Sequence, residues 1–79
     1  MNMVELMNKL EPFRGKVAYL KLFMYSDRNF HGKEYFGKLT LEERLDAGTT
    51  LVFMDAVFVI RLPDFEVFDI EITEVEERV

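Results

Sequence analysis

The stretch LVFMDAVFVIRL, residues 51–62, is the strongest indicator of the fold, because it is the longest strand-like run in the chain. Every second residue from position 52 is apolar, and the intervening row is apolar too, except at Asp55 and Arg61. A strand with apolar residues on both faces is typical of the middle of a covered sheet. We therefore expect one continuous central strand. A second interpretation is that Asp55-Ala56 marks a break where the strand bends towards solvent.

The residues after this stretch predict a turn and a last strand. Pro63-Asp64 is turn-forming sequence, and residues 65–73 alternate between apolar and acidic side chains. The alternation fails once, which indicates a bulge near Val67-Phe68. We expect residues 74–79, like residues 1–2, to be frayed.

The residues before it predict a helix and a hairpin. Residues 3–10 have apolar side chains at helical spacing, with Asn2 as N-cap, and Pro12 and Gly15 end the helix. Residues 16–25 are strand-like and residues 26–29 form a turn cluster, with Gly32 closing a longer loop. A second, shorter strand over 33–39 pairs back on the first. Gly37 within it indicates a bulge or a close approach.

Residues 40–47 allow two interpretations. Thr40 and Glu43 fit the two positions of a capping box, and Gly48 stands where a helix commonly ends, which favours a short helix. The alternative is a strand over 38–45 that turns at residues 46–48. We prefer the helix, because its start and stop signals agree.

Together these elements predict one α+β domain over residues 1–79. The expected order is helix, β-hairpin, helix, β-hairpin, with an antiparallel sheet of about four strands and the helices on one face. A chain of 79 residues has room for a single domain, and its 49% hydrophobic content supplies a core.

The composition limits the cellular compartment and the chemistry that we expect. The chain has no cysteine, which excludes disulfides and thiolate chemistry and favours a cytosolic protein. The N-terminal residues lack the pattern of a signal peptide, and no apolar run is long enough to span a bilayer. We therefore expect a cytoplasmic location.

The catalytic inventory is poor, and we predict no enzyme, cofactor or metal site. Ser26 and His31 are the only serine and histidine, and they lie within one predicted turn region without nucleophile-elbow glycines. The four glycines are scattered singly, so there is no phosphate-binding loop. Asp55 interrupts an apolar strand and could act as a general acid or metal ligand. The simpler interpretation is an ion pair with Arg44 or Arg61, or a place at a bulge or edge.

Charge is distributed unevenly along the chain. Residues 9–41 carry a net charge of +4 and residues 42–79 one of −8, within a total of −5. Alternate residues of a strand lie about 6.6–6.8 Å apart, so carboxylates along the last strand could imitate a phosphate backbone. The simpler interpretation is a solvated strand face that resists aggregation. The candidate partner-binding residues are Asp64, Glu66, Asp69, Glu71 and Glu74.

We expect a non-catalytic interaction module: an acidic inhibitor or adaptor that binds a partner protein. A nucleic-acid enzyme, bound by phosphate mimicry, is one such partner. Phage-encoded inhibitors of host enzymes are often similar in size and charge, an analogy that extends no further. The first alternative is a self-associating subunit, a homodimer through an apolar sheet face. The second is a single-stranded nucleic-acid binder using residues 14–38. Its candidate contacts are Arg14, Lys16, Tyr25, Arg28, Lys33 and Tyr35.

Overall fold

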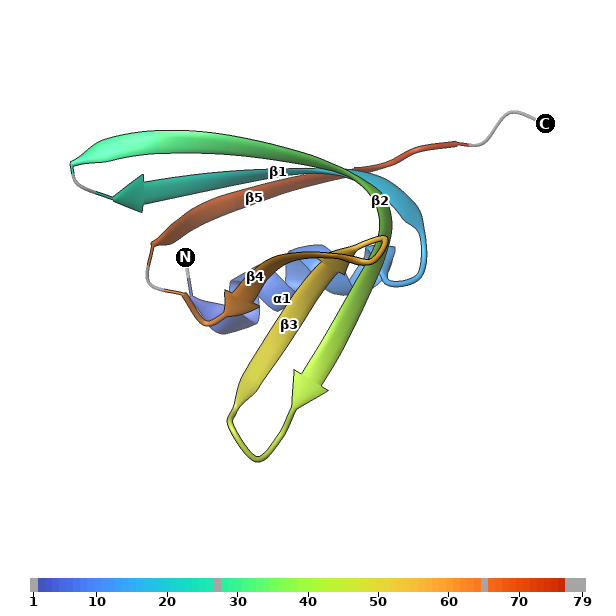
Figure 1. Ribbon diagram of the computed structural model, residues 1–79, viewed down its shortest axis with the longest axis horizontal. Coiled ribbons are helices and arrows are strands. Elements are labelled where there is room, and N and C mark those ends of the chain that lie inside the picture. Colours follow the sequence, from blue (N-terminus) through green and yellow to red (C-terminus); the bar gives the residue numbers. More distant parts are fainter. Residues whose placement is uncertain (1, 27, 65, 77–79) are drawn as a thin grey trace.

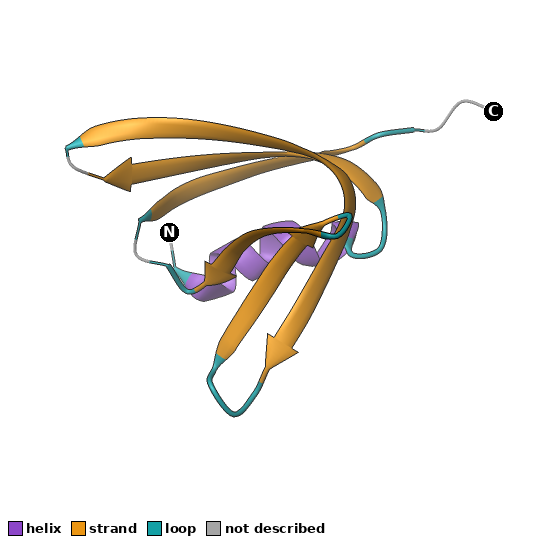
Figure 2. Cartoon of the chain, in the orientation of Figure 1, coloured by secondary structure: helices purple, strands orange, loops and turns teal. Residues whose placement is uncertain are grey.

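The computed structural model describes residues 2–26, 28–64 and 66–76, and their backbone is mostly β-structure (Figure 1, Figure 2). A short helix at the N-terminus is followed by a 3₁₀ turn and five strands. The elements are α1 Met3–Leu10, η1 Glu11–Phe13, β1 Val17–Ser26, β2 Asn29–Arg44, β3 Thr49–Met54, β4 Val57–Leu62 and β5 Val67–Glu74.

Helix α1 forms where the sequence predicts it. The Asn2 side-chain oxygen accepts a hydrogen bond from the Glu5 N–H at 2.9 Å, which caps the first turn. Leu6 and Leu10, one turn apart, are both fully buried. Gly15, at φ +77°, reverses the chain and its N–H donates to the Leu39 carbonyl at 2.8 Å.

The five strands form one antiparallel sheet in the order β4-β3-β2-β1-β5. Strand β2 is long enough to serve two partners, since its first ten residues pair with β1 and its last six with β3. Figure 1 shows β2 curving between the two halves of the sheet, with α1 on the concave side. The core lies on this concave side. Its buried apolar residues are Leu6, Leu10, Ala18, Leu20, Leu22, Leu39, Leu41, Val52, Met54, Ile60, Leu62, Val67 and Ile70.

The predicted architecture of helix, hairpin, helix, hairpin with about four strands is wrong. Residues 40–44 belong to β2, where each residue from Leu39 to Arg44 pairs with β3, and the chain turns at residues 45–48. The strand that we had ranked second is therefore the one observed. The local helix-capping signals are outweighed by burial in the core. Leu39 and Leu41, two residues apart, both bury their side chains there, and residues at this spacing share one face of a strand but not of a helix.

The first hairpin is longer and tighter than predicted. Strand β2 begins at Asn29 rather than at residue 33, and Ser26 pairs with Asn29 across a two-residue turn. Arg28 in that turn has φ +65°, while Asp27 lies outside the described residues. Gly32 pairs with Phe23 inside the ladder and closes no loop.

Residues 51–62 form two strands rather than the predicted single one. Met54 pairs with Val57 around a turn at Asp55-Ala56, so the second interpretation located the break. The two faces of this hairpin also differ. Alternate residues of β3 and β4 enter the core, whereas Phe58 on the opposite face is 53% exposed. Both faces of this hairpin carry apolar side chains, but only one face is buried in the core.

Asp55 forms no ion pair with Arg44 or Arg61 and instead joins the turn to β2. Its N–H donates to the Lys38 carbonyl at 2.8 Å, and its Oδ1 accepts from the Lys38 N–H at 2.9 Å. A Cβ on Gly37, which has φ +150°, would lie 2.5 Å from Asp55 Oδ2. The predicted close approach at Gly37 is confirmed, at the point where β2 exchanges β1 for β3 as its partner.

The predicted bulge in the last strand is also confirmed. Phe23 pairs with Asp69 and Met24 with Val67, which leaves Phe68 as the extra residue. The turn before β5 is held by Asp64, whose carbonyl accepts from the Val67 N–H at 3.1 Å. At the other end, the Val75 N–H donates to the Val17 carbonyl at 2.9 Å. Residue 65, the start of the predicted last strand, lies outside the described residues, as do residues 1 and 77–79 of the two predicted frayed ends. The other residues of those ends are described: Asn2 caps α1 and Glu74 ends β5.

Candidate functional site

Three aromatic rings gather at the end of the β1–β2 hairpin, and we call them the aromatic tip: Tyr25, Phe30 and Phe68. Tyr25 and Phe30 face each other across the two strands, with ring centroids 4.9 Å apart. The bulge in β5 places Phe68 beside them, 5.4 Å from Phe30 in an edge-to-face arrangement.

The rings of the aromatic tip remain largely in water. Their exposed fractions are 47% for Tyr25, 67% for Phe30 and 55% for Phe68. Single exposed apolar residues are ordinary on protein surfaces, but adjacent large ones form a patch of the kind that binds partners. The tip is therefore the best candidate for an interaction surface.

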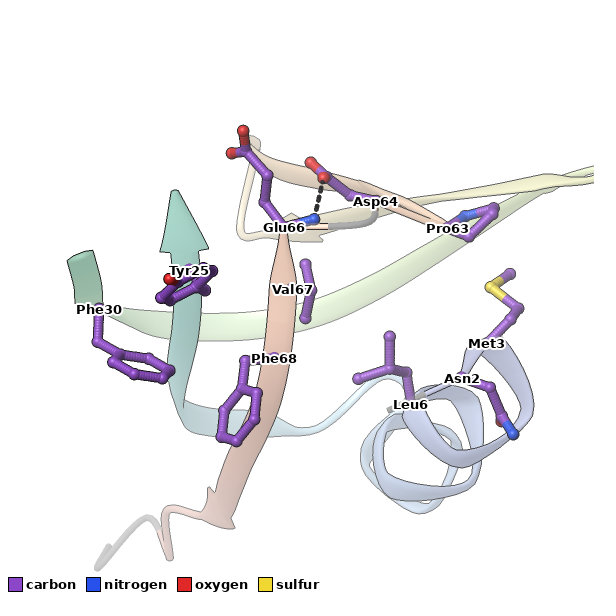
Figure 3. Close-up of a pocket in the computed structure, with 10 residues that line it drawn as sticks. All are labelled: Asn2, Met3, Leu6, Tyr25, Phe30, Pro63, Asp64, Glu66, Val67 and Phe68. Atoms are coloured by element: carbon purple, nitrogen blue, oxygen red, sulfur yellow. Dashed lines mark hydrogen bonds between the residues drawn. The ribbon is translucent and has the colours of Figure 1, made fainter. Parts of the chain in front are cut away.

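A pocket of about 520 Å³ opens beside the aromatic tip (Figure 3). Three segments that are distant in the sequence surround it: the start of α1, the end of the β1–β2 hairpin, and the connection from β4 into β5. Its lining residues are Asn2, Met3, Leu6, Tyr25, Phe30, Pro63, Asp64, Glu66, Val67 and Phe68. The lining is mostly apolar, as is typical of ligand and peptide sites.

Two carboxylates, those of Asp64 and Glu66, give the pocket an acidic rim. Asp64 Oδ1 accepts a hydrogen bond from the Glu66 N–H at 2.9 Å, which is drawn in Figure 3. Neither carboxylate forms an ion pair with any residue that the structure describes. Their negative charges are thus available at the edge of an apolar pocket.

The predicted acidic row is divided by the structure. Only Asp64 and Glu66 line the pocket. Lys9 Nζ donates a hydrogen bond to the Asp69 carboxylate at 2.8 Å, and the Ile70 N–H donates a second one to it. These bonds, that of Lys9 above all, lower the pKa of the Asp69 carboxyl.

The remaining two members lie farther along β5. Glu71 is exposed opposite Lys21, and Glu74 lies 3.7 Å from Lys16 Nζ. Two of the five predicted carboxylates, Asp69 and Glu74, therefore already have cationic partners within the chain.

The candidate nucleic-acid residues do not form one surface. Arg14 is held by Glu11 at 2.8 Å and Glu43 at 2.7 Å, and these carboxylates raise the pKa of its guanidinium. Tyr35 packs against the core. Lys16 pairs with Glu74, as described above, whereas the remaining three candidates belong, like Tyr35, to the β1–β2 hairpin. These are Tyr25, Arg28 and Lys33.

Other exposed apolar residues lie away from the pocket. On the convex side of the sheet Tyr19 pairs with Phe36, which is 61% exposed. Edge strand β4 exposes 58% of Val57 as well as Phe58, whose ring meets Phe53 edge to face at 5.8 Å. By strand alternation Tyr25 and Phe30 lie on the same face as Tyr19 and Phe36, six residues farther along each strand.

Sequence reasoning found the carboxylates of the pocket and missed most of its apolar lining. Phe30 falls in the predicted loop before Gly32, Phe68 in the predicted strand over 65–73, and Met3 and Leu6 in the predicted helix over 3–10. The excess of phenylalanine, eight in 79 residues, was the available signal. It indicated an open apolar surface without saying where the surface lies.

Ser26 and His31 both lie in strands of the β1–β2 hairpin. Ser26 ends β1 and exposed His31 pairs with Met24 within β2, so neither lies in the predicted loop. Across residues 2–26, 28–64 and 66–76, no three histidine or acidic side chains lie together as a metal site would require. The described part of the chain also contains no helix with the length and apolar character needed to cross a membrane.

The site must be interpreted from its own geometry. Fold similarity alone is weak evidence of function, because one fold hosts many activities. Here even that guide is missing, since no family model, curated protein or solved structure matches the chain.

Proposed function

We propose that this protein is a non-catalytic interaction module that binds a partner protein through the aromatic tip and the adjacent pocket. The observation that carries the proposal is the meeting of three exposed rings with a mostly apolar pocket. Aromatic residues at pocket edges commonly supply most of the binding energy of a protein interface.

The acidic character of the chain makes it an inhibitor or adaptor for a partner with a positively charged surface. Residues 42–79, which include Asp64 and Glu66, carry a net charge of −8. Complementary charge accelerates association and selects among partners. The cytosolic setting expected from the absence of cysteine is part of this proposal.

Phosphate mimicry is the narrower form of the proposal, with a nucleic-acid enzyme as partner. It requires the partner to compete with Lys9 for Asp69 and with Lys16 for Glu74. Both ion pairs are partly exposed, so each costs little to exchange for another cation.

Site-specific photocrosslinking in the native cell tests the proposal. A photoreactive benzoyl-phenylalanine replaces Phe30 at the tip, and the same group replaces Phe36, six residues farther along β2 and outside the pocket, as the matched control. We expect a discrete heterologous product from position 30 that is lost when Phe68→Ser is added. Identical products from both positions, or none from position 30, would contradict the proposal.

Self-association is the second candidate, favoured by the exposed apolar residues of β4. Phe58 is 53% exposed, Val57 is 58% exposed, and both lie at an edge of the sheet. A second copy could cover this surface as an isologous dimer. Sedimentation velocity should then give a dimer that Phe58→Ser converts to monomer, while a monomeric parent protein would exclude this candidate.

A further inference from the structure

We infer that the pocket accepts an apolar side chain of a partner segment whose neighbouring residues are lysine or arginine. This inference rests on the proposed function and specifies the chemistry of what is bound. Two features of the pocket carry it: the composition of its lining and the charge of its rim.

The apolar lining favours a ligand that inserts one apolar side chain, which we call the anchor. Met3 and Leu6 lie on one side, Val67 lies between, and the rings of the tip stand on the other side (Figure 3). The volume of about 520 Å³ lies within the range of roughly 300–1,000 Å³ that ligand pockets occupy. An inserted aromatic or branched aliphatic side chain would remove these surfaces from water.

The acidic rim, Asp64 and Glu66, favours cationic residues beside that anchor. The Asp64 and Glu66 carboxylates accept charge-assisted hydrogen bonds, which are stronger when lysine or arginine donates. The exposed ring faces of the tip also attract cations. One short segment that places a basic residue next to an apolar one satisfies both features together.

An anionic ligand fits the same pocket poorly. The two carboxylates repel phosphate or carboxylate groups, and they belong to the half of the chain, residues 42–79, whose net charge is −8. The start of α1, which could have attracted an anion, already has an internal cap from Asn2 and an acidic Glu5 in its first turn. The charges therefore favour a basic protein segment over nucleic acid.

Titration of the ¹⁵N-labelled full chain with three synthetic peptides tests the inference. The peptides share a central Leu-Trp and carry two flanking Lys, two flanking Gln or two flanking Glu on each side. We expect the Lys peptide to shift the amide signals of Leu6, Phe30 and Phe68. Its affinity at low salt should exceed that of the Glu peptide at least tenfold, and this preference should shrink in high salt.

Two pairs of variants locate the effect. Asp64→Asn with Glu66→Gln keeps the turn acceptor at Asp64 and should reduce the Lys-over-Glu preference below threefold. Asp46→Asn with Glu71→Gln removes the same charge outside the pocket and should keep most of the preference. Phe68→Ser, or Phe30→Ser, should weaken all three peptides, whereas Phe36→Ser should not. The amide spectrum of each variant reports whether it is folded.

The outcomes separate the inference from the function on which it rests. Equal binding of all three peptides at the pocket would overturn the charge preference and keep the site. Shifts of the tip signals by oligo(dT), with none by the Lys peptide, would replace a protein segment by nucleic acid. Absence of pocket shifts with every peptide and with oligo(dT) would overturn both the inference and the proposed site.

Discussion

The β1–β2 and β3–β4 hairpins both turn at a residue with positive φ, but their turns are held differently. Arg28 has φ +65° in the first turn and Asp55 has φ +56° in the second. The second turn lies against β2 and is tied to Lys38 by two hydrogen bonds. The first turn ends a ladder whose last rings, Tyr25 and Phe30, are exposed.

This difference separates a hairpin that stabilises the fold from one that presents a surface. The contact of Asp55 with Lys38 holds the bend of β2 and thus the relation between the two halves of the sheet. The aromatic tip leaves about half or more of each of its three side chains exposed, so these side chains are available for binding. We therefore expect substitutions near Gly37 and Asp55 to reduce stability, and substitutions at the tip to reduce binding.

Gly37→Ala should have the largest effect on stability. The added Cβ would meet the Asp55 carboxylate, and alanine does not favour φ +150°. Clash and backbone strain together should lower the free energy of unfolding by about 3 kcal/mol. Urea unfolding measures this loss, with Gly32→Ala as control, because a Cβ there meets nothing within 4 Å. Equal losses of stability in the two variants would contradict the role given to the contact between Gly37 and Asp55.

Asp55→Ala should have the next largest effect. It removes the acceptor for the Lys38 N–H and places alanine at φ +56°, which together cost about 2 kcal/mol. Asp55→Asn keeps an acceptor and tolerates this φ, so it should lose under about 1 kcal/mol. Urea unfolding of the two variants shows whether the hydrogen-bond acceptor or the charge of Asp55 stabilises the turn. An asparagine variant as destabilised as the alanine variant would indicate that the charge is responsible.

The Lys9–Asp69 ion pair should give the smallest effect, under about 1 kcal/mol, because both side chains are partly exposed. It ties α1 to β5 directly after Phe68 of the tip. Since Lys9 lowers the pKa of Asp69, the stabilisation is present above the unfolded-state pKa of about 3.9 and is lost as pH falls through the folded-state pKa.

Lys9→Met should therefore raise the pKa of Asp69 towards its usual value, as measured by NMR titration of the carboxyl carbon. The difference in stability between parent and variant should shrink as pH falls below about 4. A difference that stays constant down to pH 2 would show that Lys9 acts by packing rather than by charge.

The sequence predicted the features that depend on neighbouring residues. The Asn2 cap, the bulge near Val67-Phe68 and the close approach at Gly37 are all confirmed. Each is signalled within a few residues by a cap, a break in alternation or a glycine in a strand. Such signals do not depend on how distant segments pack.

The features that failed depend on distant partners. Residues 40–44 carry good helix-capping sequence, yet pairing with β3 and burial of Leu41 override it. The apolar run 51–62 predicted one continuous strand, because alternation does not reveal a turn whose residue bonds to β2. The pocket assembles from three separate segments, so no local pattern could have located it.

The most direct test compares one variant from each hairpin in two measurements. Urea unfolding and binding of the Lys-flanked peptide are measured for Phe30→Ser and for Asp55→Ala, with binding recorded where both are folded. We expect Phe30→Ser to lower the unfolding free energy by about 1 kcal/mol, through its two ring contacts, and to weaken binding at least tenfold. Asp55→Ala should lose about 2 kcal/mol of stability and bind as the parent does. A destabilised Phe30→Ser protein that still binds, or an Asp55→Ala protein that is stable and fails to bind, would contradict the division between the two hairpins.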